Sequence, residues 1–274
     1  MSTQPTLAFI GAGNMARAII GGLVSNGYPA KKIWACDTQL DKMSDLQQKG
    51  LNTTTDNNEA VAEADIVILA VKPQVLKAVA MEMAAAVQHH QPLIVSVAAG
   101  ILCSSLEQWL GGNIALVRCM PNTPALVKQG ASGLYANARV DDAQRSQTEQ
   151  IMTATGIAMW VESEAHLDAV TAVSGSGPAY YFLMMEAMVT AGEKLGLSRE
   201  VAQQLTIQTA LGAAEMASQS DVEPAELRRR VTSPKGTTER AILTFIDQGL
   251  PEIIANGMQA CYDRSAALGE ELGK

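Results

Sequence analysis

The sequence predicts an α/β protein in which a doubly wound, largely parallel sheet is followed by an all-helical domain. Three observations support this fold class. A glycine-rich turn follows an apolar strand near the start of the chain, apolar strands then alternate with helical segments, and strand signals disappear after Glu164. We therefore expect one domain over residues 1–163 and a second, helical domain over residues 164–274.

Length and composition limit the classes of protein to consider. A chain of 274 residues, 47% apolar and 18% charged, is typical of one large globular domain or two ordinary ones. The net charge of −8 argues against nucleic-acid binding, which requires a basic surface. The N-terminus has no signal core, no apolar run approaches the ~18 residues of a membrane span, and the four cysteines lack C-x-x-C spacing. We expect a cytoplasmic protein with reduced thiols.

The first strand, Leu7–Ile10, runs into Gly11-Ala12-Gly13-Asn14-Met15-Ala16, which has the form G-x-G-x-x-A. Gly11 allows a tight turn, Gly13 lets the backbone approach a pyrophosphate, and Ala16 lets the next helix lie close to the strand. The helix N-terminus presents N–H groups and partial positive charge to phosphates. This stretch predicts a Rossmann-like dinucleotide-binding domain, with a purely structural turn as the alternative.

The second strand is predicted over residues 32–36, with Asp37 at its end. An acidic side chain there accepts hydrogen bonds from the adenosine ribose hydroxyls and favours NADH. It also repels a 2′-phosphate, because two unit charges ~4 Å apart cost about 4 kcal/mol at an effective dielectric constant of ~20. A turn-forming Asp before Thr38 is the alternative, and Lys42 offsets part of the repulsion. The sequence favours NADH without excluding NADPH.

Buried strands follow, each ending where a ligand can bind. After a short helix over residues 41–49, the run Ile66–Val71 is typical of a parallel strand buried on both faces. It stops at Lys72-Pro73, at the carboxyl end of the strand, so Lys72 is either a cofactor contact or a surface charge. The strand over residues 93–97 is followed by the small residues Ala98-Ala99-Gly100. The remaining strands are predicted over residues 114–118, 132–135 and 157–161.

Residues from 164 onward carry only helical signals. A helix over residues 165–173 is interrupted by Ser174-Gly175-Ser176-Gly177-Pro178, and the next helix, residues 179–195, is apolar on nearly all sides. Such a helix must be buried on most sides. Further helices are predicted over residues 198–218, 224–230, 239–247 and 251–272. Because so much apolar surface cannot be hidden within one small domain, we expect this domain to form the interface of a homo-oligomer.

The chain offers no strong acid or base for catalysis. His89 and His90 fall in a predicted loop, His166 resembles no catalytic base, and neither metal-ligand spacing nor a Ser/His pair is present. Reduction of a cyclic imine needs no such group. A protonated C=N bond is already electrophilic, so the protein need only hold hydride donor and acceptor together and neutralise the substrate's other charge.

The loop Ser233-Pro234-Lys235-Gly236-Thr237-Thr238 can meet that last requirement. It brings backbone N–H groups and two hydroxyls to a helix N-terminus, which is a natural seat for a carboxylate. The alternative is that Thr237 or Thr238 is only the N-cap of the following helix, and composition alone favours this alternative. The segment Ser174–Gly177 leaves the same choice between a helix cap and a wall of the site.

Five motifs occur in a fixed order along the chain: Phe9–Ala16, Ala70–Pro73, Arg118-Cys119-Met120-Pro121-Asn122-Thr123-Pro124, Ala172–Tyr180 and Ser233–Thr238. In sequence, order and spacing they closely resemble the pyrroline-5-carboxylate reductase family, over essentially the whole chain. The resemblance implies hydride transfer from NADH or NADPH to the imine carbon of 1-pyrroline-5-carboxylate, giving L-proline in the last step of proline biosynthesis. It also implies a homodimer with interlocking helical domains, often in a larger ring of dimers.

The resemblance assigns residues to each part of the site and implies no metal. Cofactor contacts fall on Ile10, Gly11, Ala12, Gly13, Asn14, Met15, Asp37, Asn57, Ala70, Val71, Lys72, Pro73, Val97, Ala98 and Ala99. Substrate contacts fall on Ser176, Ser233, Lys235, Gly236, Thr237 and Thr238. Thr238 is the catalytic residue, because the resemblance places a threonine there to hydrogen-bond the imine nitrogen.

Two positions depart from the family pattern. The family usually has Gly where Lys235 stands, and Lys enters positive-φ conformations less freely. We expect either a stiffer or differently shaped loop, or an added cation near the substrate carboxylate. Asp37 replaces the small or basic residues common in NADPH-preferring relatives, which again favours NADH.

Two other functions compete with the reductase. A hydroxyacid dehydrogenase has a similar two-domain layout but requires an acid/base in the cleft, for which Lys194 is the single candidate. A nucleotide-sensing regulatory protein would need the dinucleotide-binding domain but not the Thr237-Thr238 loop.

Overall fold

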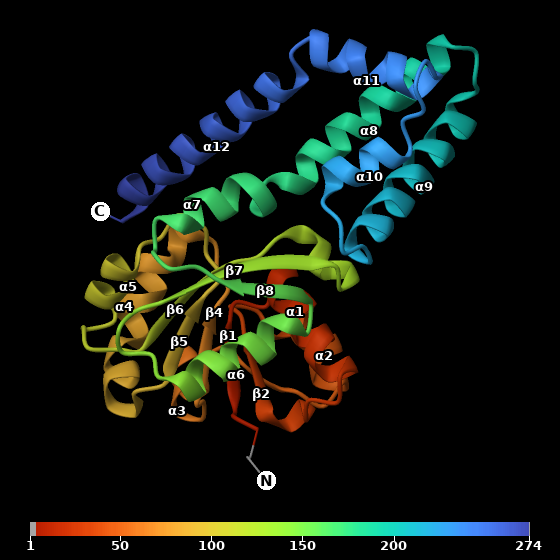
Figure 1. The fold of residues 1–274 in the computed structure, drawn as a ribbon. Helices are drawn as coiled ribbons and strands as arrows, with labels where there is room; N and C mark the ends of the chain where they lie inside the picture. The colour runs from red at the N-terminus through yellow and green to blue at the C-terminus, as the bar shows by residue number, and fades with distance from the viewer. Residues whose placement is uncertain (1–3, 274) are drawn as a thin grey trace. The chain divides into compact units, whose positions relative to one another are not determined.

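A computed structural model describes residues 4–273 (Figure 1). Its contacts group the chain into two compact units. One contains the residues up to Ser176 together with those from Cys261 onward, and the other contains residues 177–260. The predicted domain boundary at residue 163 stays a prediction. The compact units divide the chain differently, because residues 164–176 and 261–273 pack in the same unit as the sheet.

The first unit is built on an eight-stranded sheet of order β3-β2-β1-β4-β5-β6-β7-β8. Neighbouring strands run parallel except β6 and β7, which are antiparallel. This arrangement confirms the predicted doubly wound, largely parallel sheet. The strands are β1 (Leu7–Ile10), β2 (Ile33–Cys36), β3 (Asn52–Thr54), β4 (Ile66–Leu69), β5 (Leu93–Ser96), β6 (Leu116–Met120), β7 (Gly130–Ala136) and β8 (Gly156–Trp160).

Helices cover both faces of the sheet, because alternate strand residues point to opposite sides. On one face Phe9 of β1 packs with Ile19 and Ile151 from α1 and α6. On the other, Ile10 packs with Leu76 and Leu106 from α4 and α5. Burying each such side chain contributes about 1.5–3 kcal/mol. The helices of this unit are α1 (Asn14–Ser25), α2 (Ser44–Gln48), α3 (Asn57–Ala62), α4 (Pro73–His90), α5 (Cys103–Trp109), α6 (Asp142–Thr153) and α7 (His166–Val170).

Three local expectations are corrected. The strand predicted from residue 114 begins at Leu116. His89 and His90 do not lie in a loop but end α4, with their rings in edge-to-face contact. The predicted break at 174–178 is a π-helical turn, η4 (Thr171–Gly175), in which the Ser176 N–H donates to the Thr171 carbonyl at 2.8 Å. The chain therefore passes from α7 through η4 into the next helix, α8 (Gly177–Lys194), without a loop.

The second unit is helical, as predicted. Ser198 caps α9 by accepting a hydrogen bond from the Val201 N–H. The side chains of Tyr181, Phe182 and Leu183 on α8 are 63–70% exposed in the single chain, so their burial requires a partner. The helices are α8 (Gly177–Lys194), α9 (Arg199–Ser218), α10 (Pro224–Arg230), α11 (Thr237–Asp247) and α12 (Leu250–Leu272), which ends in the first unit. None of the helices within residues 4–273 has the length and apolar character of a membrane span.

Candidate functional site

The glycine turn after β1 is shaped by a close approach to β4. Gly11 has φ +97°, and a Cβ there would lie 2.8 Å from the Ala70 carbonyl oxygen and 2.9 Å from Val71 Cγ1. Its N–H donates to the Cys36 carbonyl at 2.8 Å, and the Ala70 N–H donates to Ile10 at the same distance. Gly11 is thus required by the fold at the point where β1, β2 and β4 end together.

Gly13 meets no such requirement. It is the N-cap of α1 with φ −75°, and a Cβ there would have no atom within 4 Å. The open space lies over the N-terminus of α1, whose first turn carries no acidic residue, while Ala16 is fully buried. A helix N-terminus with room for close backbone approach suits a pyrophosphate. The turn therefore fits the dinucleotide that the sequence predicts.

Asp37 stands at the carboxyl end of β2, beside this turn. Its Oδ2 accepts a hydrogen bond from the Ala12 N–H at 3.1 Å, and Oδ1 is 3.3 Å from the Thr38 hydroxyl. A pocket here brings Asp37 together with four other residues predicted to contact the cofactor. It is lined by Ile10, Gly11, Cys36, Asp37, Thr38, Thr55, Asn57, Val71 and Val79. Thr55 and Val79 carried no sequence signal.

The Cys36 thiol orients one of these residues. Its Sγ donates to Asn57 Oδ1 at 3.0 Å. Burial and, secondly, the charge of Asp37 raise the pKa of Cys36 to about 12, so the thiol keeps its proton at neutral pH. The thiol is therefore a fixed donor that holds the Asn57 amide at the pocket.

Arg17 also belongs to this region, although no sequence pattern predicts a role for it. Its Nε donates to the Ala12 carbonyl at 2.9 Å, and its Nη1 forms an ion pair with Asp45 at 2.6 Å. Nη2 donates to the Lys42 carbonyl. The hydrogen bond from Arg17 lowers the pKa of the Asp45 carboxyl. Arg17 thus ties the glycine turn to the segment after β2, and a local pattern could not reveal a contact between residues 28 apart in sequence.

The other predicted cofactor residues lie at the ends of neighbouring strands. Lys72 is the N-cap of α4, with its side chain exposed, and Pro73 is the first residue of that helix. Val97, Ala98 and Ala99 directly follow β5. Because β4 pairs in parallel with β1, and β5 in parallel with β4, these segments emerge at the same edge of the sheet as the glycine turn.

The loop Ser233–Gly236 belongs to the second unit. Its Gly236 N–H donates to the Ser233 carbonyl at 3.0 Å, and Gly236 is the N-cap of α11. No side chain caps this helix, so the N-cap interpretation of Thr237 or Thr238 is wrong. The two threonines are instead its first two residues and are exposed. Both hydroxyls therefore stand in the first turn, beside N–H groups that have no partner within the helix.

Lys235 adopts the left-handed conformation that Gly enters without strain. Its φ is +61°, where a side chain costs about 1 kcal/mol. The Lys235 N–H donates to Glu239 Oε2 at 2.7 Å. Glu239 thus reaches back from the first turn of α11 and holds the loop in this conformation.

Ser176 follows the π-helical turn, and its Oγ accepts a hydrogen bond from Cys261 Sγ at 3.3 Å. The buried Asn122 fixes this turn, since its amide donates to the Ser174 carbonyl at 3.0 Å and accepts from the Ala131 N–H at 2.9 Å. Lys194, the candidate for a dehydrogenase, is exposed at the last position of α8. Within residues 4–273, no group of three acidic, His or Cys side chains could hold a metal ion.

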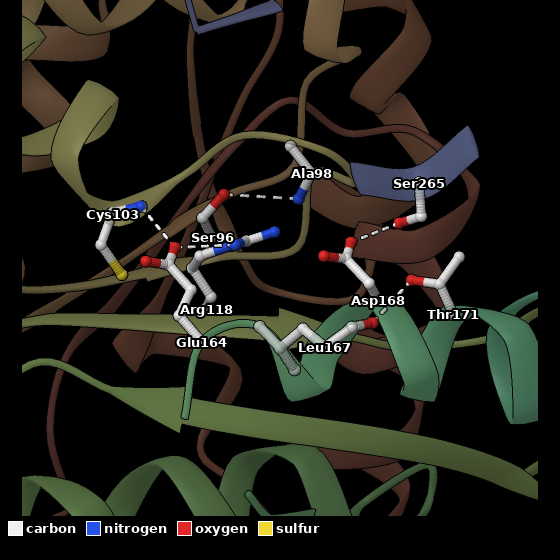
Figure 2. A network of polar contacts seen from close by, with 9 residues as sticks. All are labelled: Ser96, Ala98, Cys103, Arg118, Glu164, Leu167, Asp168, Thr171 and Ser265. Atoms are coloured by element: carbon white, nitrogen blue, oxygen red, sulfur yellow. Dashed lines mark hydrogen bonds and ion pairs between the residues drawn. The ribbon is translucent and has the colours of Figure 1, made fainter. Parts of the chain in front are cut away.

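A polar network joins α5, β6 and the segment before α7 (Figure 2). Glu164 Oε1 accepts from Arg118 Nη1 at 2.7 Å and from the Cys103 N–H at 2.6 Å. Beside it, the Ser265 hydroxyl donates to Asp168 Oδ1 at 2.6 Å. Burial, and secondly the charge of Glu164, raise the pKa of the Cys103 thiol. No local sequence pattern indicates a role for Glu164, because its partners lie 46 and 61 residues away.

Comparison with known proteins gives two matching family models. Residues 164–268 match pyrroline-5-carboxylate reductase dimerisation, and residues 6–100 match NADP oxidoreductase, coenzyme F420-dependent. The first match covers the helices whose apolar side chains are exposed in the single chain. It supports the predicted oligomerisation through this part of the protein.

Relatives of known name match over the full length. A pyrroline-5-carboxylate reductase of Pseudomonas aeruginosa is 58% identical over 100% of both chains. The structure of such a reductase from Coxiella burnetii has a TM-score of 0.94 at 43% identity, covering 97% of this chain and 99% of that one. The Plasmodium falciparum pyrroline carboxylate reductase, solved with NADP bound, has a TM-score of 0.84 at 28% identity, covering 97% and 98%. The chain therefore belongs to the pyrroline-5-carboxylate reductase family.

Proposed function

We propose that the protein reduces the cyclic imine 1-pyrroline-5-carboxylate to L-proline with NADH or NADPH, as the final step of proline biosynthesis. The observation that carries the proposal is the identity of 58% over the full length of a protein with this name. The open helix N-terminus at Gly13 and the pocket at Asp37 support it independently, because they fit a dinucleotide.

The chain's own residues would hold the cofactor along one edge of the sheet. The N-terminus of α1, with Asn14 and Met15 in its first turn, would hold the pyrophosphate, and Asp37 with Asn57 would hold the adenosine ribose. Segments 70–73 and 97–99 line the path toward the nicotinamide. When bound, the reduced cofactor supplies one hydride from its nicotinamide ring.

The substrate residues bind and orient the imine. The first turn of α11 and the loop Ser233–Gly236 seat the carboxylate, the Lys235 ammonium adds positive charge, and Ser176 adds a hydroxyl. Thr238 hydrogen-bonds the imine nitrogen. The hydride forms a C–H bond at the imine carbon while the π electrons of the C=N bond become the lone pair of the amine nitrogen. The nitrogen keeps the proton that it carries as an iminium, so no strong acid or base is required.

The proposal extends to assembly and location. The helical part joins two copies into a homodimer, and dimers associate further into a ring. The protein acts in the cytoplasm, without nucleic acid as a partner. The exposed apolar side chains of α8 and the family match over residues 164–268 support the dimer. Size-exclusion chromatography with light scattering measures the number of copies.

The reaction is tested by absorbance at the nicotinamide band, with purified protein and synthetic 1-pyrroline-5-carboxylate. We expect oxidation of the reduced cofactor and formation of an equal amount of L-proline, measured by mass spectrometry. A folded protein that binds cofactor but produces no proline would contradict the proposal and favour a nucleotide sensor. Turnover of a 2-hydroxy acid in its place would favour the dehydrogenase alternative.

Lys235→Gly tests the substrate loop. The change removes the ammonium near the proposed carboxylate seat and relieves the positive-φ strain. We expect KM for the imino acid to rise about two- to fivefold, the range of an exposed ion pair, with KM for the cofactor unchanged. Lys235→Ala is the matched control, since it removes the charge but keeps the strain. A larger change in the cofactor KM than in the imino-acid KM would remove Lys235 from the substrate loop.

A further inference from the structure

The segment Val97–Leu102, here called the β5–α5 loop, contains three of the proposed cofactor residues. Its start is fixed to the sheet, because the Val97 N–H donates to the Leu69 carbonyl at 3.1 Å and the Ala98 N–H lies 3.4 Å from Ser96 Oγ. The sheet order β2-β1-β4-β5 also gives this loop a place along the dinucleotide. With the adenosine at β2 and the pyrophosphate at β1, the loop after β5 reaches the nicotinamide end.

The far end of the β5–α5 loop is held by a distant carboxylate. The loop ends where α5 begins at Cys103, and the N-cap residue Leu102 supplies no side-chain hydrogen bond. Glu164 Oε1 accepts from the Cys103 N–H at 2.6 Å in its place. Glu164 therefore caps the N-terminus of α5, although it lies far from this helix in sequence. Its negative charge is favourable beside the N–H groups of a helix N-terminus.

Arg118 fixes the carboxylate in turn. Figure 2 shows the Arg118 guanidinium and the Cys103 amide converging on Glu164, and Nη1 lies 2.7 Å from Oε1. Arg118 is 7% exposed and stands opposite Ser96 in the register of β5 and β6. A guanidinium so buried needs a charged partner, and this pair provides it. Through Glu164, the ion pair thus connects β6, the neighbour of the strand that ends in the loop, with the start of the helix that follows the loop.

The middle of the β5–α5 loop is covered by the end of α12. A Cβ at Gly100, which has φ +73°, would lie 3.4 Å from Leu268 Cβ and 3.6 Å from Leu272 Cδ1. The hydrogen bond from Ser265 to Asp168 fastens this part of α12 to α7. The β5–α5 loop therefore has contacts at its start, middle and end. The ion pair between Arg118 and Glu164 stabilises the contact at its end.

We propose that Glu164 and Arg118 are positioning residues for the cofactor. Their pair holds the β5–α5 loop in the conformation that receives the nicotinamide end. The inference rests on the proposed function, because it takes residues 97–99 as cofactor contacts. The pair acts through the loop, so its loss weakens cofactor binding and leaves binding of the imino acid unchanged.

The test measures binding of NADH and NADPH by nucleotide fluorescence, without imino acid, and hydrogen exchange of the amides of residues 97–103. We expect Glu164→Ala to raise the cofactor Kd about tenfold and to accelerate exchange at Cys103. Glu164→Gln keeps an acceptor oxygen and raises Kd at most about threefold. Glu271→Ala, which removes an exposed ion pair with Arg264, is the matched control and leaves Kd unchanged.

A double variant, Glu164→Ala with Arg118→Met, separates positioning from general stability. It leaves no unpaired buried charge, so we expect it to regain melting temperature relative to Glu164→Ala while Kd stays raised about tenfold. If Glu164→Ala does not fold, the cofactor Kd of the double variant alone tests the inference. A wild-type Kd in the double variant would overturn the inference. Cofactor binding is measured without imino acid, so this test does not depend on catalysis. A wild-type protein that binds cofactor but fails to reduce the imine would contradict the proposed function, and the comparison of cofactor Kd values would still decide the role of Glu164 and Arg118.

Discussion

Thr238→Ala is expected to lower kcat about 10²- to 10³-fold and to leave the Kd of the cofactor unchanged. Removing one hydrogen bond to a reacting group costs about 2.7–4 kcal/mol of transition-state stabilisation. Here the Thr238 hydroxyl oxygen would accept that hydrogen bond from the iminium N–H. Thr238 is an exposed residue in the first turn of α11 that caps nothing, so the substitution removes no structural hydrogen bond. Steady-state kinetics with imino acid varied at saturating cofactor measure the loss.

Two variants control this experiment. Thr238→Ser keeps the hydroxyl and should retain at least a tenth of the wild-type kcat, and Thr237→Ala removes the neighbouring hydroxyl of the same turn. We expect Thr237→Ala to affect KM for the imino acid more than kcat, because its hydroxyl belongs to the proposed seat of the carboxylate. Wild-type kcat in Thr238→Ala would show that the hydroxyl does not contact the reacting nitrogen.

Asp37→Ser is expected to raise the ratio of kcat/KM for NADPH to that for NADH about 100-fold. A full unit-charge repulsion of about 4 kcal/mol would correspond to about 1000-fold, and solvent at this half-buried position reduces it. The measurement compares both cofactors at fixed imino acid. The Asp37 carboxylate also accepts the Ala12 N–H, so Asp37→Ser disturbs the glycine turn as well.

Asp37→Asn separates these two effects. Its amide oxygen still accepts from the Ala12 N–H, while the charge that repels a 2′-phosphate is gone. We expect most of the change in preference to appear in Asp37→Asn, and none in Asp41→Asn, which neutralises an exposed residue of the next segment. An unchanged preference in both Asp37 variants would remove this residue from cofactor selection.

The strands of the sheet were predictable where burial on both faces produces a continuous apolar run, as in Ile66–Leu69. The edge strand β3 escaped prediction because its three residues, Asn-Thr-Thr, carry no apolar signal. The π-helical turn escaped because Ser174–Gly177 has the composition of a loop. A Cβ at Gly175 would lie 2.5 Å from Met120 Cε, the flexible end of that side chain.

The candidate site was predictable to the extent that it is local in sequence. The glycine turn and the residue after β2 follow from strand, turn and helix patterns, and the structure places them together around one pocket. The positive φ of Lys235 agrees with the family's usual Gly at this position. The contacts of Arg17 and Glu164 join segments 25 to 61 residues apart, and only the folded chain brings them together.

Transfer of deuterium from the reduced cofactor to proline tests most directly the central claim, that the protein reduces the imine by hydride transfer. The protein is supplied with 1-pyrroline-5-carboxylate and with NADH or NADPH that carries deuterium at the transferred position of nicotinamide C4. We expect L-proline with one deuterium on the ring carbon that was the imine carbon, and a higher rate with NADH. Proline without deuterium, or no proline from a folded protein that binds the cofactor, would contradict the account.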